Sequence, residues 1–387
     1  MSIIEKDKQY VAGTYNRFPV EIVSGKGSVV YDTAGKEYID MGSGIGVTSF
    51  GIGDDTWKNA VIAQLDKVQH MSNLYYTEPC AKLAELLCTK TGMKKVFFSN
   101  SGAEANECAI KAARKYAAEK KSPEYSTIIT LKNSFHGRTL TTLAATGQEH
   151  YHELYNPLTP GFVHVENGNI EELKSTIAAN KAAALMIECI QGEGGVIPID
   201  PGYAKAAYEI CRENDILLIV DEVQTGNGRT GKLYAYMNYD ITPDIVSTAK
   251  GLAGGLPIGA TLLGEKVENI FKFGDHGSTF GGNPVASAAA CSIIERIDEK
   301  LLDEVKQKAE YVKNAVTGKP GIEGVTGLGL MIGIKTVKPA ADVAKACMEK
   351  GVLVLTAKDK VRLLPALNIP QDVLAKAVSV ILECCAE

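Results

Sequence analysis

One lysine stands where its side-chain amine could react. Lys250 lies in the stretch TAKGLAGGLPIGA, residues 248–260, between the apolar run DIVSTA and a series of glycines. DIVSTA predicts a short buried strand, and no charged residue follows Lys250 before Glu265, so no neighbour downstream in the sequence neutralises its ammonium group. Lys250 is therefore either a side chain that leaves the core for solvent or a reactive amine.

A carboxylate and a helix start occupy comparable positions elsewhere in the chain. Asp221 follows the apolar run ILLIV, and ligands gather at the carboxyl ends of strands in open α/β sheets. The stretch FFSNSGAEANE, residues 97–107, predicts a strand, a turn and a helix start, where the backbone N–H groups of Gly102 and Ala103 could bind a phosphate. Taken singly, Asp221 could be a buried cap and Ser101 an ordinary helix cap.

Together these three features fit one cofactor, pyridoxal phosphate. Its aldehyde requires a lysine amine, its ring nitrogen an acid, and its phosphate a helix N-terminus. We therefore predict an enzyme with Lys250 and Asp221 as catalytic residues. The motif GNGRTG, residues 226–231, matches a dinucleotide-binding pattern, but DEVQT separates it from the strand and no helical period follows, which disfavours a nicotinamide-dependent dehydrogenase.

The surrounding elements predict how these residues are positioned. Apolar strand-like runs alternate with segments of helical period, which is typical of a mostly parallel sheet covered by helices. Around Gly282 the pattern changes to a smaller α+β region. We predict a large cofactor-binding domain over residues 46–282 and a small domain built from residues 1–45 and 283–387. The predicted strands include KKVFFSN, STIITLKN, AAALMIECI, ILLIVDEV and DIVSTAK, and a hairpin turns between Asp32 and Gly35.

Composition excludes several classes of protein. The 387 residues carry a formal net charge of -5, with no basic block, so neither nucleic acid nor an anionic membrane is the expected partner. No apolar run approaches the length of a membrane span, and the first ten residues lack the features of a signal peptide. The nine cysteines have no metal-ligand spacing, so we predict no metal, reduced thiols and a cytoplasmic protein.

Seven motifs in order resemble those of the class-III, ω-amino family of pyridoxal-phosphate-dependent aminotransferases, which have fold type I. The resemblance extends from residue 15 to the last helix. It implies an aminotransferase, because Lys250 and Asp221 are both present, whereas a non-catalytic cofactor-binding module would lack one of them. An aminomutase of the same fold would convert one substrate without 2-oxoglutarate. The motifs are SNSGAEANE, SFHGRT, ECIQGEGG, DEVQTGNGRTG, AKGLAGGLPIGA, HGSTFGGNP and VRLLPAL.

The resemblance also implies roles for individual residues. Lys250 would bind the cofactor covalently and move the proton, Asp221 would keep the ring nitrogen protonated, and Phe135 would stack on the ring. Thr279 would reach the phosphate of the neighbouring subunit, which implies a homodimer with shared sites. The predicted cofactor-binding residues are Gly102, Ala103, Phe135, Asp221, Glu222, Val223, Gln224, Lys250 and Thr279.

Substrate recognition follows from the same resemblance. Arg138 would hold a substrate carboxylate in a bidentate manner, and Ser278 would add a contact. Glu193 would pair with Arg362 when an ω-amine is bound and release it for the second carboxylate of glutamate.

The implied substrates are N2-acetyl-L-ornithine and 2-oxoglutarate, which places the reaction in arginine biosynthesis. In the run DMGSGIGV, Ile45 stands where ornithine-specific relatives carry a tyrosine, and this loss of a hydroxyl favours an acylated amine. Succinylornithine, N-succinyl-diaminopimelate, ornithine and 4-aminobutyrate remain alternative donors.

Overall fold

A seven-stranded sheet lies at the centre of the large domain in the computed structural model, which describes residues 1–387. One strand, β12, runs antiparallel to both of its neighbours, and the other strands run parallel to one another. The predicted fold class, a mostly parallel sheet flanked by helices, is therefore confirmed. The strand order is β4 (Lys95–Ser99), β12 (Gly259–Leu263), β11 (Ile245–Thr248), β10 (Leu217–Asp221), β7 (Ala182–Ile187), β5 (Thr127–Leu131) and β6 (Phe162–Val165).

The inner strands are short apolar runs because both faces of this sheet are covered. Every residue of β7, β10, β11 and β12 is buried, as expected for strands that helices cover on both sides. Helices α5 (Gly102–Lys120) and α6 (Leu140–Ala145) cover one face. The other face is covered by α4 (Glu78–Thr91), α7 (Ile170–Ala179), α8 (Pro201–Glu213) and α9 (Pro284–Ile294).

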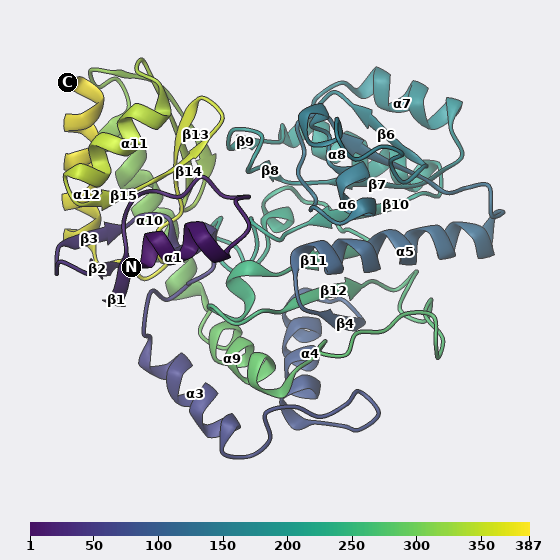
Figure 1. Cartoon of the computed structure of the whole chain (residues 1–387). Helices are drawn as coiled ribbons and strands as arrows, with labels where there is room; N and C mark the ends of the chain where they lie inside the picture. The colour runs from purple at the N-terminus through teal and green to yellow at the C-terminus, as the bar shows by residue number, and fades with distance from the viewer.

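The small domain combines the two ends of the chain (Figure 1). Strand β3, from the predicted hairpin, pairs in parallel with β15, more than three hundred residues later. The first sheet has the order β1 (Ile22–Lys26), β2 (Val29–Asp32), β3 (Glu37–Asp40) and β15 (Val352–Leu353). The second has the order β13 (Ile322–Leu328), β14 (Met331–Thr336), β17 (Lys360–Leu363) and β16 (Leu355–Ala357), and the helices are α10 (Glu299–Val316), α11 (Ala340–Glu349) and α12 (Gln371–Ala386).

The domain boundary that we placed at residue 283 is too early. Helix α9 packs against α3 (Asp55–Leu65) and α4, and its buried side chains belong to the core of the large domain. The core of the small domain takes up residues of α10 only from Val312 onward. The sequence change at Gly282 therefore marks the entry to α9, and the small domain resumes within α10.

None of the helices has the length and apolar character of a membrane span. Several short elements complete the chain. The turn α2 is unusual, because Ser43 to Gly46 all have positive φ angles between 46° and 74°. Ile45 is strained there, since β-branched residues rarely adopt left-handed backbone. The remaining elements are α1 (Ile3–Tyr10), α2 (Ser43–Gly46), β8 (Ile190–Gln191), β9 (Ile197–Pro198) and the 3-10 helices η1 (Glu149–Tyr151), η2 (Ala235–Asn238) and η3 (Lys250–Leu252).

A buried arginine joins the two domains. The Arg229 guanidinium donates hydrogen bonds from Nη1 to the carbonyl oxygens of Leu330, at 3.1 Å, and Pro365, at 2.5 Å. The Arg229 carbonyl in turn accepts a bond from the Leu330 backbone N–H. No carboxylate pairs with this guanidinium in the structure, and burial lowers the pKa of Arg229 to about 9.

Candidate active site

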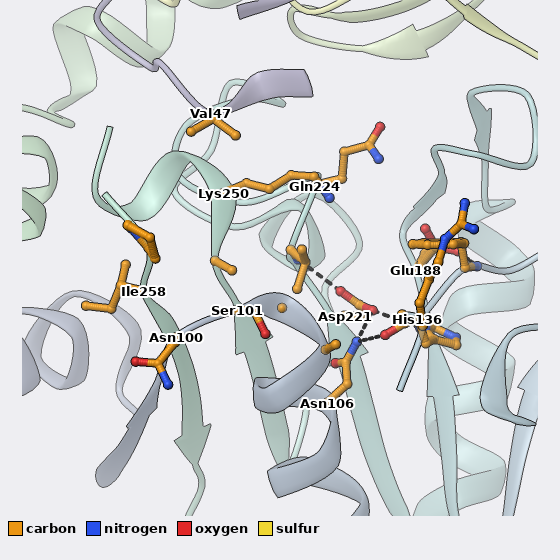
Figure 2. A pocket seen from close by; sticks show the side chains of 18 of the residues that line it. Val47, Asn100, Ser101, Asn106, His136, Glu188, Asp221, Gln224, Lys250 and Ile258 are labelled. Carbon is orange, nitrogen blue, oxygen red and sulfur yellow. Dashed lines mark hydrogen bonds and ion pairs between the residues drawn. The ribbon is translucent and has the colours of Figure 1, made fainter. Parts of the chain in front are cut away.

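A cavity of about 430 Å³ opens at the carboxyl ends of the central strands (Figure 2). This is the edge at which open α/β sheets bind ligands. Segments as far apart in the sequence as Val47 and Ile258 converge on it, and the parallel strands deliver their carboxyl ends to this side. Of the predicted site residues, it is lined by Gly102, Ala103, Phe135, Arg138, Asp221, Val223, Gln224 and Lys250.

Lys250 lies two residues after the end of β11 and begins η3. Its φ angle is +41°, a left-handed conformation that costs a non-glycine residue of the order of 1–3 kcal/mol. Burial lowers the pKa of Lys250 below its ordinary value, although the carboxylates of Asp221 and Glu193 act in the opposite direction. The lowered pKa enlarges the neutral, nucleophilic fraction of the amine. Lys250 therefore does not leave the core for solvent, and its amine lies at the cavity.

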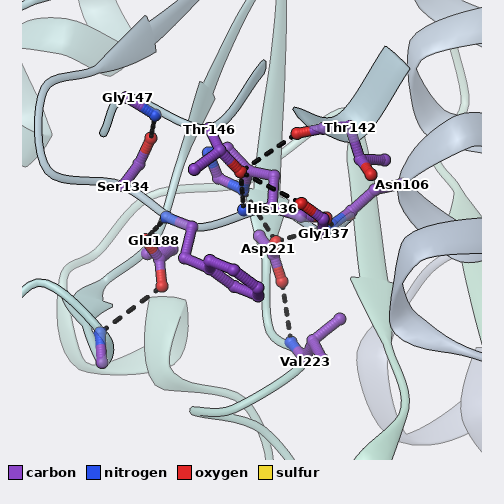
Figure 3. A network of polar contacts seen from close by, with 12 residues as sticks. Asn106, Ser134, His136, Gly137, Thr142, Thr146, Gly147, Glu188, Asp221 and Val223 are labelled. Atoms are coloured by element: carbon purple, nitrogen blue, oxygen red, sulfur yellow. Dashed lines mark hydrogen bonds and ion pairs between the residues drawn. The ribbon is translucent and has the colours of Figure 1, made fainter. Parts of the chain in front are cut away.

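Asp221 ends β10 and is almost fully buried, with 4% of the residue exposed. Its Oδ2 accepts hydrogen bonds from Asn106 Nδ2 at 2.7 Å and from His136 Nδ1 at 2.8 Å, and its Oδ1 accepts one from the Val223 backbone N–H at 3.0 Å (Figure 3). These donors offset the cost of burying the carboxylate. Because Oδ1 accepts a single bond and Asp221 lines the cavity, it can accept a further donor from a ligand.

His136 and Glu188 are buried titratable groups that the sequence analysis missed. Burial alone lowers the pKa of His136, but its hydrogen bond to Asp221 and the charge of that carboxylate raise it above the ordinary value. Burial raises the pKa of Glu188 to about 7. Glu188 Oε2 accepts a bond from the Phe135 backbone N–H at 2.9 Å, and Oε1 accepts one from Gly192 at 3.4 Å. Both side chains line the cavity.

The start of α5 also lines the cavity. Ser101 caps the helix, since its hydroxyl accepts a hydrogen bond from the Glu104 backbone N–H. The N–H groups of Gly102 and Ala103 have no partner within the helix because they lie in its first turn. A Cβ on Gly102 would lie 2.6 Å from Val223 Cγ1, so only glycine allows the helix start to lie this close to the Asp221 strand. The arrangement suits an anion such as a phosphate.

Phe135 and Arg138 lie on the loop that follows β5. The Arg138 guanidinium stacks over the ring of Tyr151, at 4.6 Å, and lies 5.7 Å from the Phe135 ring centroid. Arg138 forms no ion pair with any carboxylate in the structure, and its side chain is exposed at the cavity. This guanidinium is therefore oriented by aromatic contacts and available to a carboxylate ligand. Tyr151, which lies in η1, was not identified from the sequence.

A second arginine, Arg362, is masked, which means that its guanidinium is already paired with a carboxylate, that of Glu193. Arg362 Nη1 lies 2.6 Å from Glu193 Oε1, and the Arg362 side chain is 4% exposed. The same Nη1 donates to Gln224 Oε1 at 3.1 Å, and the Arg362 Nε has no partner. Although burial acts to raise the pKa of Glu193, the charge of Arg362 lowers it below the ordinary value. Gln224 lines the cavity, so the pair borders the site.

Five predicted residues do not line the cavity of their own chain: Glu193 and Arg362, whose pair borders it, and Glu222, Ser278 and Thr279. Glu222 is fully buried, and its carboxylate accepts bonds from Thr225 Oγ1 at 2.6 Å and from the Tyr236 backbone N–H at 2.8 Å, so we correct its role to a structural one. Ser278 Oγ accepts a bond from Asn100 Nδ2, and Thr279 is exposed. Both lie in the loop between β12 and α9, outside this cavity.

The position expected for Ile45 is also corrected. Ile45 lies in the left-handed turn α2 and lines a neighbouring cavity of about 380 Å³ together with Arg17 and Phe18. Val47, two residues later, lines the main cavity instead. Ile45 and Val47 thus border different cavities, because the chain reverses through the left-handed turn between Ser43 and Gly46.

The donor set in this cavity fits pyridoxal phosphate. A buried lysine of lowered pKa, a buried aspartate with an accepting oxygen and an unobstructed helix start lie in one cavity of suitable size. His136 Nε2 and Asn106 Oδ1 are buried without partners beside Asp221, as in a site prepared for polar contacts. The fold and this site together define a pyridoxal-phosphate enzyme of fold type I.

Comparison with known proteins identifies the family. Residues 10–385 match the model of the family described as aminotransferase class-III. The chain is 49% identical over 387 residues to an acetylornithine aminotransferase of Haemophilus ducreyi, covering all of this chain and 98% of that one. It is 45% identical to an acetylornithine aminotransferase of Methanocaldococcus jannaschii, covering 95% and 94% of the two chains.

Solved structures agree with this result. An ornithine aminotransferase of Toxoplasma gondii, with pyridoxal phosphate at its active site, has a TM-score of 0.94 and 33% identity over 99% of this chain and 93% of its own. An N-acetylornithine aminotransferase of Stenotrophomonas maltophilia has a TM-score of 0.86 and 33% identity over 99% and 98%. The chain belongs to the class-III aminotransferase family. It is an aminotransferase, and its cofactor is pyridoxal phosphate.

Proposed function

We propose that the enzyme transfers the δ-amino group of N2-acetyl-L-ornithine to 2-oxoglutarate, giving N-acetyl-L-glutamate 5-semialdehyde and L-glutamate, in arginine biosynthesis. The full-length relatives named as acetylornithine aminotransferases support this choice of donor. The structural observation that carries it is the pair of arginines at the cavity, of which Arg138 is free and Arg362 is masked by Glu193.

This difference between the arginines suits two unlike substrates. A substrate with one carboxylate is bound by Arg138 while Arg362 stays neutralised by Glu193. A dicarboxylate such as 2-oxoglutarate requires both arginines, so the Glu193 carboxylate has to release Arg362. One site then accepts both partners of the reaction without leaving a buried guanidinium unpaired.

Residues already described hold the cofactor and move protons. When bound, pyridoxal phosphate supplies an aldehyde that condenses with amines and a ring that withdraws electrons. Lys250 would hold the aldehyde, Asp221 the ring nitrogen, and the N–H groups of Gly102 and Ala103 the phosphate. The Lys250 amine, once released by the incoming amine, takes and returns a proton at Nζ; its lowered pKa suits this exchange. His136 and Asn106 keep Asp221 oriented.

The active form in this proposal is a homodimer with shared sites. Thr279 is exposed and does not reach the cavity of its own chain. Large apolar side chains are exposed in the segment 71–76 and in the loop that carries Thr279. Asn73 Nδ2 joins this segment to the loop, because it donates hydrogen bonds to the carbonyl oxygens of Ser278 and Gly281. Exposed apolar patches of this kind mark interaction surfaces. The exposed residues are Met71, Leu74, Tyr75, Tyr76, Phe273 and Phe280.

We place the enzyme in the cytoplasm. All nine cysteines are unpaired, and seven of them are buried. Unpaired thiols throughout a chain are typical of a reducing compartment.

Absorbance spectroscopy tests the proposed reaction. The purified protein is saturated with pyridoxal phosphate and titrated in turn with N2-acetylornithine, succinylornithine, N-succinyl-diaminopimelate, ornithine and 4-aminobutyrate. We expect acetylornithine to bleach the visible band at the lowest concentration and 2-oxoglutarate to restore it. Lys250→Ala should show no such band, whereas Lys266→Ala, which changes a lysine paired with Asp244 outside the cavity, should behave as the wild type.

The outcomes separate chemistry from substrate. A band that responds best to another donor would keep the aminotransferase chemistry and replace acetylornithine by that donor. A band that is independent of Lys250 would contradict the assignment of the reactive amine.

A further inference from the structure

The loop between β12 and α9 carries the residues that the proposed dimer shares. In Figure 1 this green loop extends beneath α5. Its residues Gly277, Thr279 and Phe280 are exposed, and Thr279 makes no hydrogen bond to its own chain. A threonine that has to meet a ligand across a subunit interface needs a loop that is already in place, because ordering it on binding weakens affinity.

The end of the loop nearest the cavity is held by two asparagines. Asn73 Nδ2 donates to the carbonyl oxygens of Ser278 and Gly281, both at 2.9 Å. Asn100 Nδ2 donates to Ser278 Oγ at 3.1 Å, and the same hydroxyl accepts the Gly281 backbone N–H at 2.9 Å. These contacts fix the residue before Thr279 and the turn after it.

The far end of the loop is held by α5. Lys111 Nζ donates to the Asp275 carbonyl oxygen at 2.9 Å and lies 3.0 Å from His276 Nδ1. Because an ammonium group can only donate, this contact requires Nδ1 of His276 to be unprotonated. Lys115 forms an ion pair with the Asp275 carboxylate, which also accepts the Lys272 backbone N–H at 2.6 Å.

The His276 ring is in addition packed between two aromatic side chains. Its centroid lies 4.6 Å from that of Phe97, on β4, and 5.8 Å from that of Phe271, at the beginning of the loop. His276 thus connects the loop both to the central sheet and, through Lys111, to α5. The first residues of α5, Gly102 and Ala103, are those proposed to hold the phosphate in the same chain.

Resting on the shared-site dimer proposed above, we infer that His276 is a positioning residue for the cofactor of the opposite subunit: clamped by Lys111, Phe97 and Phe271, it holds the loop so that Thr279 is presented to the phosphate bound by the other chain. His276 touches neither cofactor nor substrate. It acts through Thr279, three residues further along the chain.

A double-mutant cycle on cofactor affinity tests this inference. The affinity of the cofactor-free dimer for pyridoxal phosphate is measured by quenching of protein fluorescence for the wild type, His276→Ala, Thr279→Val and the double variant. We expect each single substitution to weaken binding about 3- to 10-fold, and the double variant to be no weaker than Thr279→Val alone. Size-exclusion chromatography establishes that each variant is still a dimer.

Two further variants distinguish the loss of the His276 contact from a general folding defect. Lys111→Met keeps the aromatic packing of His276 and removes only the ammonium contact, so a smaller loss in the same direction is expected. Lys121→Met removes a lysine at the other end of α5 that bonds the Asn214 carbonyl oxygen, and it should leave affinity unchanged.

The possible failures are distinguishable. Normal affinity of the dimeric His276→Ala variant, or losses that simply add in the double variant, would overturn the role of His276 while the shared site stands. Normal affinity of Thr279→Val would overturn the shared phosphate site and this inference with it.

Discussion

Replacing Glu193 by glutamine removes the negative charge from the ion pair that Glu193 forms with Arg362. The Nη1 to Oε1 distance of 2.6 Å and the 4% exposure of Arg362 describe a charge-assisted hydrogen bond with little access for water. Hydrogen bonds to charged groups contribute about 1.5–3 kcal/mol, which corresponds to about 10- to 150-fold in an equilibrium constant. The glutamine keeps the size and one accepting oxygen, so the perturbation is mainly the loss of the anion.

The two half-reactions should respond in opposite directions. Glutamate and 2-oxoglutarate no longer have to displace an anion from Arg362, so their kcat/KM rises or holds. Acetylornithine binds while Arg362 is left without a carboxylate, so its kcat/KM falls. We expect the ratio of kcat/KM for acetylornithine to that for glutamate to fall at least about 10-fold.

Single-turnover absorbance changes with each amine in turn measure the two values separately. Glu304→Gln is the matched control, because Glu304 pairs with Lys308 at 3.6 Å on α10 and lies outside the cavity. A ratio that stays within about twofold of the wild type in a folded Glu193→Gln protein would refute the idea that this pair discriminates between substrates.

Three further substitutions probe the site. Arg138→Lys loses the bidentate fork and should lower kcat/KM about 10- to 100-fold for both substrates in steady-state assays; a loss with only one of them contradicts a shared carboxylate site. Gly102→Ala drives a Cβ to 2.6 Å from Val223, so spectroscopic titration should show cofactor affinity reduced about 10-fold in a folded protein, and normal affinity would count against the phosphate cradle. Glu188 has its pKa raised from 4.5 to about 7, so the native state keeps a proton that the unfolded chain releases, and the resulting stability is full below about pH 4.5 and lost as pH rises through about 7. Glu188→Gln should therefore flatten the fall in Tm between about pH 5 and about pH 7, and an unchanged slope would disprove this titration.

The sequence alone predicted those strands whose own residues form a recognisable pattern. Strands β7, β10 and β11 are uninterrupted apolar runs, because a sheet covered on both faces requires them. We did not predict β6 or β12. The edge strand β6 has only four residues and is half-buried, and β12 follows the glycine series after Lys250, which has no strand pattern. Gly259 serves packing, since a Cβ there would lie 2.2 Å from the Ser101 carbonyl oxygen.

Only some of the site residues could be predicted from the sequence, because the others meet through contacts between distant segments. Lys250 and Asp221 were found because Asp221 is the last residue of an apolar strand and Lys250 lies just after one. Asn106 and His136 contact Asp221 across 115 and 85 residues, and nothing in their local sequence indicates this. Glu188 could have been found by the reasoning applied to Asp221, because it too follows an apolar strand, β7.

The buried Arg229 bears on how the molecule comes apart. Its guanidinium binds the carbonyl oxygens of Leu330, just before β14, and Pro365, shortly after β17, and Arg229 lies five residues after Gln224, in the same segment that borders the cavity. Separating the domains would break both of these hydrogen bonds. The two domains should therefore melt together, in one calorimetric transition whose measured enthalpy equals the van't Hoff value. Loss of the small domain's structure would then empty the cofactor site in the same step, so that cofactor release reports on unfolding of the whole chain.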